Sequence, residues 1–253
     1  MLLNRSLLAV LCAVSLFFVS TSAQTFPIKK RKTTIVGARA VVYDERLSAL
    51  RIRPDIKSPI IQRLHRDREV GIIGKPFKVK DGPIFQPVMV SRNTRGWVIA
   101  DALSLPQRGR DAARMMNLID ETKDDFNRAR LARLCADQYR GNVVAAKALL
   151  KLGEATEHAA IRLSREAKKR IGELDEELDK NLSQRDYMLN YVGLDRYNKI
   201  GATFDYDEAS GNLIYDGGAY QEISKKYPRS PEAVTAHERL EKIKSVRTPV
   251  VQK

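Results

Sequence analysis

The chain has little of the chemistry on which disulfides, metal sites and cofactor sites depend. Its 253 residues include only two cysteines, three histidines and one tryptophan. Cys12 lies in the apolar N-terminal segment, so removal of that segment would leave Cys135 alone and exclude a disulfide within the mature chain. Cys135 falls in a helical pattern, where a small buried side chain is the simplest interpretation. We expect no metal and no cofactor.

Motifs of catalysis are absent as well. His237 lacks the second histidine of a helical zinc motif, and residues 71–76 have neither the spacing nor the Ser or Thr of a phosphate-binding loop. The loop at 205–211 has the acidic residues of a calcium loop but not their spacing. No Gly-x-Ser-x-Gly sequence occurs. The sequence therefore predicts a protein that is not an enzyme.

Long apolar runs are also absent after the N-terminus, which itself has the pattern of an export signal. Arg5 precedes an apolar run from Leu7 to Val19, a length typical of a signal-peptide core and short for a bilayer span. Small residues follow, and we predict a signal peptide over 1–23 that is cleaved after Ala23. A retained membrane anchor is the alternative. Cleavage predicts a periplasmic or secreted protein whose mature chain has no transmembrane segment.

Acidic residues are in the minority, with 31 against 45 basic residues and a formal net charge of +14. The excess is local. Residues 24–110 contain 19 basic and 7 acidic residues, whereas residues 111–253 contain 25 and 24. Part of the excess lies in a leader at 29–32, which we interpret as a basic linker over 24–34. We expect an acidic partner such as an anionic polymer or a headgroup surface, and export disfavours nucleic acid.

The mature chain divides near residue 107 into a strand-rich and a helix-rich part, which predicts an α+β protein. Short β-branched and apolar segments separated by turn residues predict strands at 34–43, 50–53, 69–73, 77–80, 84–90 and 96–100. Apolar residues at helical spacing predict helices at 111–121, 124–139 and 143 to about 182. Gly153 and Gly172 are candidate breaks in the last of these.

The helix-rich part contains a weak internal repeat and a hairpin. Residues 139–145 and 227–233 share the pattern Tyr-x-x-polar-x-x-Ala, in which the tyrosine ends one helix and Asn142 or Ser230 caps the next. Apolar segments on either side of a Ser-Gly-Asn turn predict a hairpin near 203–216. Seven of the nine tyrosines lie between 187 and 227. Packing explains them most simply, and a sugar- or peptide-binding surface is the alternative.

Several motifs of the strand-rich part are similar to those of bacterial SH3-like domains. The similar segments are Ala-Leu-Arg-Ile-Arg-Pro at 49–54, the apolar segments at 60–64 and 69–74, the Asp-Gly turn with the strand that follows it at 81–88, and the closing Gly-Trp-Val at 96–98. Two departures concern Ile84 or Phe85, which replaces a usual tryptophan, and Arg66-Asp67, which stands where a glycine is common. The resemblance implies a small SH3-like β-barrel over 35–105 that binds cell-wall or peptide ligands and is not catalytic.

The helix-rich part resembles the tetratricopeptide-like helical hairpins of bacterial envelope proteins. Residues 218–230 carry the best match. The resemblance implies an all-α helical-hairpin domain over 106–245 that binds protein, followed by a tail at 246–253. Because fewer than three clear units occur, we expect a divergent helical array at most.

The candidate ligand-binding residues are basic and aromatic side chains of the strand-rich part: Tyr43, Arg51, Arg53, Phe85, Arg92, Arg95 and Trp97. Arg51 and Arg53 alternate along one predicted strand and should share a face. That face is either simply solvated or, together with Arg92 and Arg95, a site for an anionic ligand. Trp97 either closes the core or offers a stacking platform.

These patterns together predict a non-enzymatic, exported cell-envelope adaptor. Its barrel would bind a cell-wall polymer or another anionic or peptide ligand, and its helical part would bind a protein partner. Two alternatives stay open. The chain could be a structural subunit of an envelope or secreted complex, or it could be an accessory to a cell-wall hydrolase.

Overall fold

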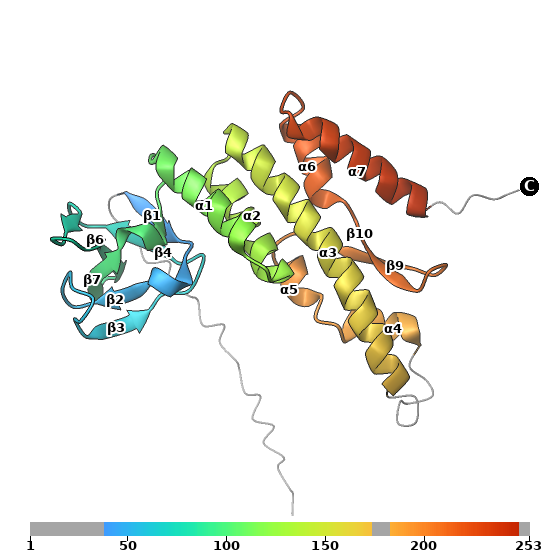
Figure 1. Cartoon of the computed structure of the whole chain (residues 1–253), viewed down its shortest axis with the longest axis horizontal. Helices are drawn as coiled ribbons and strands as arrows, with labels where there is room; N and C mark the ends of the chain where they lie inside the picture. Colours follow the sequence, from blue (N-terminus) through green and yellow to red (C-terminus); the bar gives the residue numbers. More distant parts are fainter. Residues whose placement is uncertain (1–37, 174–182, 248–253) are drawn as a thin grey trace, which may run out of the picture. The chain divides into compact units, whose positions relative to one another are not determined.

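The structure is a computed structural model that describes residues 38–173 and 183–247. Several predictions fall outside the described residues: the signal peptide, the basic linker, the last part of the helix predicted to reach residue 182, and all but the first two residues of the tail. The described residues combine an antiparallel sheet with seven α-helices (Figure 1). The predicted α+β class is therefore confirmed.

The sheet has eight strands in the order β3-β2-β7-β6-β4-β1-β8, with β5 paired to β6 off this path. The strands are β1 (Arg39–Val42), β2 (Ala49–Arg51), β3 (Ile60–Arg63), β4 (Glu69–Ile72), β5 (Phe77–Lys78), β6 (Ile84–Ser91), β7 (Thr94–Ile99) and β8 (Leu103–Ser104). All their pairings are antiparallel. In the part of the chain that the structure describes, the order ends at β3 and β8, so the sheet is not closed into a barrel.

One face of the sheet forms an apolar core. Leu50, Val70, Val88, Val98 and Leu103 have no exposed surface and belong to one cluster. Alternation of apolar residues along β6 and β7 explains this face, because side chains two positions apart in a strand point to the same side. Two 3-10 segments, η1 (Glu45–Leu47) and η2 (Ala100–Ala102), connect strands at the rim.

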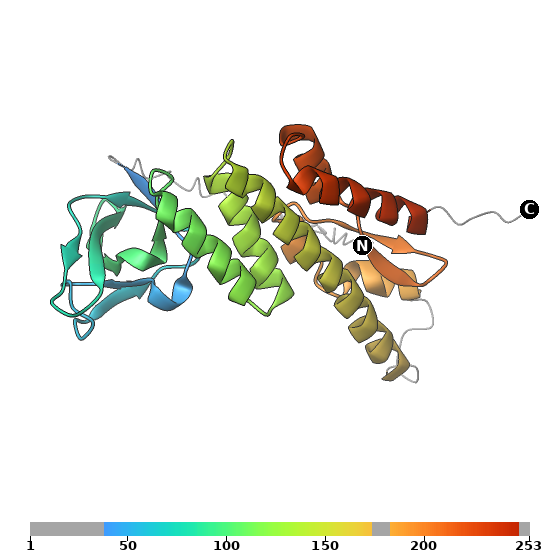
Figure 2. The same ribbon diagram turned by 45° about the horizontal axis from the view of Figure 1, so that its top comes forward.

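The helices follow the sheet in the chain. They are α1 (Gly109–Glu121), α2 (Asp125–Gln138), α3 (Val143–Glu173), α4 (Gln184–Asn190), α5 (Asp195–Asn198), α6 (Gly218–Lys226) and α7 (Glu232–Arg247), with a hairpin of β9 (Phe204–Asp207) and β10 (Asn212–Tyr215) between α5 and α6. The long helix α3 packs against α1, α2, α6, α7 and β10, and Figure 2 shows α2 lying along it.

Helix α3 runs without a break through Gly153, so the candidate break at that residue was wrong. The helix ends at Glu173, one residue after Gly172, and the residues that follow lie outside the described chain. Gly153 instead allows a close approach to α6. A Cβ atom at this position would lie 2.3 Å from Cε1 of Tyr220, whereas a Cβ atom at Gly172 would meet nothing within 4 Å. The turn before α3 is made by Gly141, whose φ of +81° is the left-handed conformation that glycine adopts at little cost.

Buried aromatic rings hold the helical part together. Tyr197 packs edge-on against Phe126 at 5.1 Å and against Phe204 at 5.2 Å, and Tyr215 packs against Tyr220 at 5.9 Å. All three tyrosines are essentially without exposed surface. Packing therefore explains these members of the tyrosine-rich segment.

The two copies of the repeat pattern contact each other. Tyr139 and Tyr227 follow α2 and α6 directly, and the backbone N–H of Gly141 donates to the hydroxyl of Tyr227 at 3.3 Å. Asn142 accepts a hydrogen bond from the N–H of Val144 at 3.1 Å, as a capping residue does. The hydroxyl of Ser230 has no hydrogen-bond partner among the described residues, so the prediction that it caps α7 was wrong.

Polar contacts join the sheet to the first two helices. Arg130 of α2 bonds to the carboxylate of Asp67 at 2.8 Å and to the carbonyl of Arg66 at 3.0 Å. The hydroxyls of Ser104 and Tyr139 lie 2.9 Å apart. Asp67 has a φ of +68°, a left-handed conformation that is uncommon for residues other than glycine. The carboxylate of this residue also forms the ion pair with Arg130.

Candidate functional site

A row of cross-strand partners crosses the sheet on the face opposite its core. Arg51 of β2 lies directly opposite Ile60 of β3 and Trp97 of β7, and Trp97 lies opposite Pro87 of β6. Directly opposed residues of antiparallel strands share a face. We call Ile60, Arg51, Trp97 and Pro87 the outer row. Three of the predicted ligand-binding residues thus lie together, since Arg95 is two residues from Trp97 along β7.

Trp97 is half-buried in this row. The ring of Phe77 meets it edge-on, with the centroids 6.3 Å apart and the planes at 72°. Phe77 itself is 49% exposed. The two rings together present apolar surface to solvent next to guanidinium groups, an arrangement that suits a sugar ring or an apolar side chain. The structure thus leaves part of the Trp97 ring accessible.

Arg51 is fixed by the loop that follows it. One of its guanidinium nitrogens donates to the carbonyl of Ser58 at 2.8 Å, while its Nε is buried without a hydrogen-bond partner among the described residues. Strand β2 ends at Arg51, so strand alternation does not place Arg53 beside it as expected. Arg53 is exposed in the loop, and its backbone N–H donates to the hydroxyl of Ser58 at 3.0 Å.

Arg95 and Arg92 lie at the end of the β6–β7 hairpin. Arg95 is opposite Met89 in the strand pair, and Arg92 is in the turn that joins the strands. Both side chains are exposed, and no acidic group of the described chain lies within ion-pair distance of them. Their positive charge is therefore available to a ligand.

Tyr43 and Phe85 are buried, with 3% and 0% of their surface exposed. Tyr43 packs into the core that includes residues of α1 and α2, and burial raises its pKa to about 12. Phe85 lies opposite Phe77 in the β5–β6 pair. Neither side chain offers surface to a ligand, so we assign both to packing.

Several exposed basic side chains of the sheet half, residues 38–107, have no ion-pair partner within the described chain. Four acidic residues of this half already pair with arginines: Asp44, Asp67, Glu69 and Asp101. No ion pair within the described chain involves the exposed residues that we call the cationic set: Arg53, Lys57, Arg63, Lys75, Lys78, Lys80, Arg92 and Arg95. The excess charge predicted from the sequence is thus not neutralised by the described acidic groups.

The sequence analysis missed a group of exposed isoleucines at the β2–β3 hairpin. Ile52, Ile56, Ile60 and Ile61 are 57%, 55%, 43% and 45% exposed. From the sequence, the segment at 60–64 only resembles a strand of SH3-like domains, and in the structure only Leu64 of it is buried. Four isoleucines within ten residues, broken by two prolines rather than alternating with polar residues, were the available signal.

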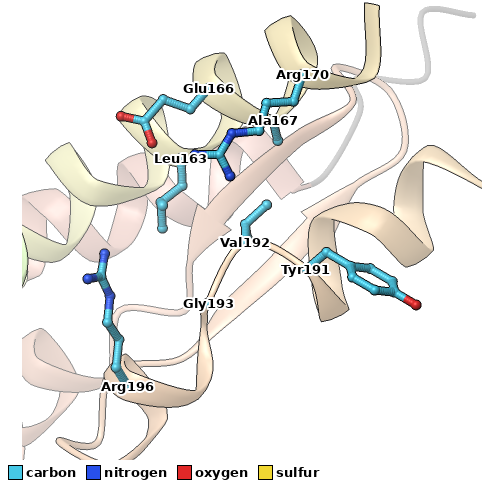
Figure 3. Close-up of a pocket in the computed structure, with 8 residues that line it drawn as sticks. All are labelled: Leu163, Glu166, Ala167, Arg170, Tyr191, Val192, Gly193 and Arg196. Carbon is cyan, nitrogen blue, oxygen red and sulfur yellow. The ribbon is translucent and has the colours of Figure 1, made fainter. Parts of the chain in front are cut away.

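The helical half has a pocket of about 300 Å³ between α3 and the turn after α4. Figure 3 shows its lining residues: Leu163, Glu166, Ala167, Arg170, Tyr191, Val192, Gly193 and Arg196. Glu166 bonds to Arg162 at 3.0 Å, not to Arg170 as helical spacing also allows. Arg196 lies over the ring of Phe126 at 4.8 Å. The charged groups at this pocket are exposed, and it contains no arrangement with an evident catalytic role.

Other reactive or anchoring features are few in the described parts of the chain. Over residues 38–173 and 183–247, no group of three or more His, Cys, Asp or Glu side chains could hold a metal ion. Burial raises the pKa of the Cys135 thiol to about 12, which makes the thiolate scarce at neutral pH. None of the helices in these ranges combines the length and apolar composition needed to cross a membrane.

Comparisons of the chain with protein-family models, with curated proteins and with solved structures found no match.

Proposed function

We propose that this protein is an exported, non-enzymatic adaptor of the cell envelope. Its sheet half would bind an anionic cell-wall polymer or an anionic peptide ligand, and its helical half would bind a protein. The observation that carries the proposal is the cationic set of the sheet half, one member of which, Arg95, lies two residues from the half-buried Trp97 on β7. Export rests on the N-terminal pattern, which lies outside the described residues.

The chemistry of the sheet half supports an anionic ligand. A single mobile anion binds weakly to any one exposed cation. A polymer that carries many carboxylates or phosphates can contact several cations at once and therefore binds more strongly. Trp97 and Phe77 supply an apolar surface against which a sugar ring or a peptide side chain can stack. Binding of this kind weakens as salt rises, because exposed charges are screened.

We infer that the sheet half is SH3-like, since the resembling segments at 49–54, 60–64 and 69–74 contain β2, β3 and β4. We also infer that the helical half is tetratricopeptide-like. The paired helices α2–α3 and α6–α7, with the repeated tyrosine pattern at each turn, support that inference.

Exposed apolar side chains on the helices support the protein-binding role of the helical half. Val143, Ile161 and Val234 are 67%, 60% and 66% exposed. Basic and acidic residues are nearly balanced in this half, with 25 against 24 over residues 111–253. A nearly neutral surface with exposed aliphatic groups is better suited to protein contacts than to a polyanion.

Sedimentation with purified bacterial sacculi tests the proposal. The chain from Gln24 onward, which retains every described residue, should sediment with sacculi at low salt. Arg92→Glu combined with Arg95→Glu should abolish most of this binding. The matched control reverses two exposed cations of α3 that also lack an ion-pair partner among the described residues, Lys147→Glu with Arg165→Glu, and should bind normally. Absence of binding by the unmodified chain, or equal loss in both double variants, would reject the proposed site.

A structural subunit of an envelope complex is the second candidate, favoured by the exposed apolar residues on α3 and α7. It predicts that crosslinking captures one stable protein partner. It also predicts that the chain does not sediment with sacculi at any salt concentration. Sacculus binding that depends on Arg92 and Arg95 would exclude a purely structural role for the sheet half.

A further inference from the structure

The β2–β3 hairpin carries the densest group of exposed aliphatic side chains in the sheet half. Ile52, Ile56, Ile60 and Ile61 fall within ten residues, and Ile52 and Ile56 are each more than half exposed. We call these four residues the isoleucine tip. Large apolar side chains grouped on a surface mark a site of interaction with a protein or a membrane.

The loop that presents the isoleucine tip is held by a set of hydrogen bonds. The N–H of Ile52 donates to the carbonyl of Pro59 at 3.2 Å, and the N–H of Ser58 donates to the carbonyl of Asp55 at 3.1 Å. The buried Ser58 also accepts from the N–H of Arg53 and from Arg51. The hydrogen bonds of the buried Ser58 and the restricted backbone of Pro54 limit the conformations of this loop. They therefore favour the exposed position of Ile56.

Basic residues flank the isoleucine tip. Residues 51–63 contain four basic side chains and one acidic one. The acidic residue, Asp55, uses a carboxylate oxygen to accept a hydrogen bond from the N–H of Lys57 at 2.9 Å. Arg53, Lys57 and Arg63 belong to the cationic set. Aliphatic groups are thus exposed beside several cations that have no ion-pair partner in the described chain.

We propose that the isoleucine tip docks into an anionic lipid surface, with Ile52 and Ile56 entering the boundary between headgroups and acyl chains while Arg53 and Lys57 contact the headgroups. Interfacial binding needs exactly these two contributions, apolar area that leaves water and cations that attract anionic lipid. Residues 51–63 contain arginines, which both kinds of surface use, but no Trp or Tyr, in which protein interfaces concentrate much of their binding energy. A protein partner is therefore less well matched.

This inference goes beyond the proposed function, because it rests on the isoleucine tip and does not require a cell-wall ligand, although Arg53 and Lys57 also belong to the cationic set. The two sites lie in the same half of the chain. An adaptor with both would be held at a lipid surface by the hairpin while Trp97 and Arg95 meet the polymer. Either site could be absent without affecting the argument for the other.

Vesicle sedimentation measures the proposed docking. The chain from Gln24 onward should bind vesicles of phosphatidylcholine mixed with the anionic lipid phosphatidylglycerol and should not bind phosphatidylcholine alone. Ile52→Ser combined with Ile56→Ser should weaken binding by about tenfold or more, because two aliphatic side chains no longer leave water. Both positions are over half exposed, so the variant should unfold at the same temperature as the unmodified chain.

A matched control separates the hairpin from general surface hydrophobicity. Ile161→Ser with Val234→Ser removes two equally exposed aliphatic residues from α3 and α7 and should leave vesicle binding unchanged. The basic leader at 29–32 is present in all variants, so its contribution cancels. Equal binding by the two double variants, or no binding to the anionic vesicles, would overturn the proposal.

A fluorescent label tests insertion directly. Ile56→Cys provides an accessible thiol, because Cys135 is buried and Cys12 is not part of the chain from Gln24. An environment-sensitive dye at position 56 should shift to shorter wavelength with anionic vesicles, whereas the same dye at Ile161→Cys should not. Binding without a shift at position 56 would show that charge alone holds the protein, and would refute insertion. Sacculus binding by the Ile52→Ser, Ile56→Ser variant distinguishes failure of this inference from failure of the proposed function.

Discussion

Replacement of Gly153 by alanine adds one methyl group in the middle of α3, and its effect on stability should be opposite to that expected from helix propensity. Alanine is favoured over glycine inside a helix by about 1 kcal/mol. At Gly153, however, the new Cβ atom would lie 2.3 Å from Cε1 and 2.4 Å from Cζ of Tyr220. Carbon atoms in contact normally stay about 3.5–4.0 Å apart. The overlap is more than 1 Å and involves a ring rather than a flexible chain end.

The magnitude follows from the burial of the ring. Tyr220 has no exposed surface and packs against Tyr215, so it cannot turn away without disturbing a second buried ring. Overpacking of this kind costs about 1–3 kcal/mol. Taking about 3 kcal/mol for a clash with a confined ring and subtracting about 1 kcal/mol of helix propensity, we expect Gly153→Ala to be destabilising by about 2 kcal/mol. The melting temperature should fall by roughly 4–8 °C.

Urea denaturation followed by circular dichroism measures this change. Gly172→Ala is the matched control, because it lies in the same helix and its Cβ atom would meet nothing within 4 Å. It should be stabilising by about 0.5–1 kcal/mol. In a Tyr220→Leu background the Gly153→Ala change should cost much less, because the ring is gone. A Gly153→Ala protein as stable as the unmodified one would refute the close approach of α3 and α6.

Three further predictions concern single residues. Cys135 should not react with a thiol reagent at pH 8 in the folded protein and should react at once in urea, because burial holds its pKa near 12. Tyr43 should lower the free energy of unfolding as pH rises from about 10 to about 12. An unfolded tyrosine ionises near pH 10, whereas the folded Tyr43 stays protonated up to its pKa of about 12. Tyr43→Phe should reduce this loss of stability in a series of denaturation measurements at alkaline pH. Asp67→Ala should be destabilising by about 1–2 kcal/mol in urea denaturation, through loss of the Arg130 ion pair and through a side chain that disfavours positive φ, whereas Asp67→Gly should cost less.

The division of the chain and much of its secondary structure could be predicted from sequence. Helices α1 to α3 begin within two residues of the predicted positions, because apolar spacing marks all three and an acidic first turn marks α1 and α2. The continuity of α3 could not be predicted. A glycine inside a helix either breaks it or admits a neighbour, and the neighbour here is Tyr220, which is distant in the sequence.

The candidate site could be predicted only in part, because its geometry also depends on contacts between distant parts of the chain. Residue types identified Arg51 and Trp97, but their adjacency depends on the register between β2 and β7, which no local pattern encodes. The burial of Tyr43 depends on helices that pack against β1 and follow much later in the chain. Alternation along a strand shows which side of the strand is apolar. It does not show which other part of the chain covers that side.

The exposure of the isoleucine tip was not predicted from the sequence. The segment at 60–64 resembles a strand of the SH3-like pattern, and that resemblance does not indicate which of its side chains are exposed. In the structure β3 is an edge strand whose four residues are all exposed. Exposure at a sheet edge depends on which strands are neighbours, and that is a property of the whole fold.

The central claim is that the cationic set binds an anionic ligand of the cell wall. Its most direct test is sedimentation of the chain from Gln24 onward with purified sacculi across a series of salt concentrations. We predict strong binding at low salt that declines steadily toward 1 M salt, where the screening length falls to about 3 Å. Binding that is unchanged across the series, or no binding at low salt, would contradict the proposed electrostatic role of these residues.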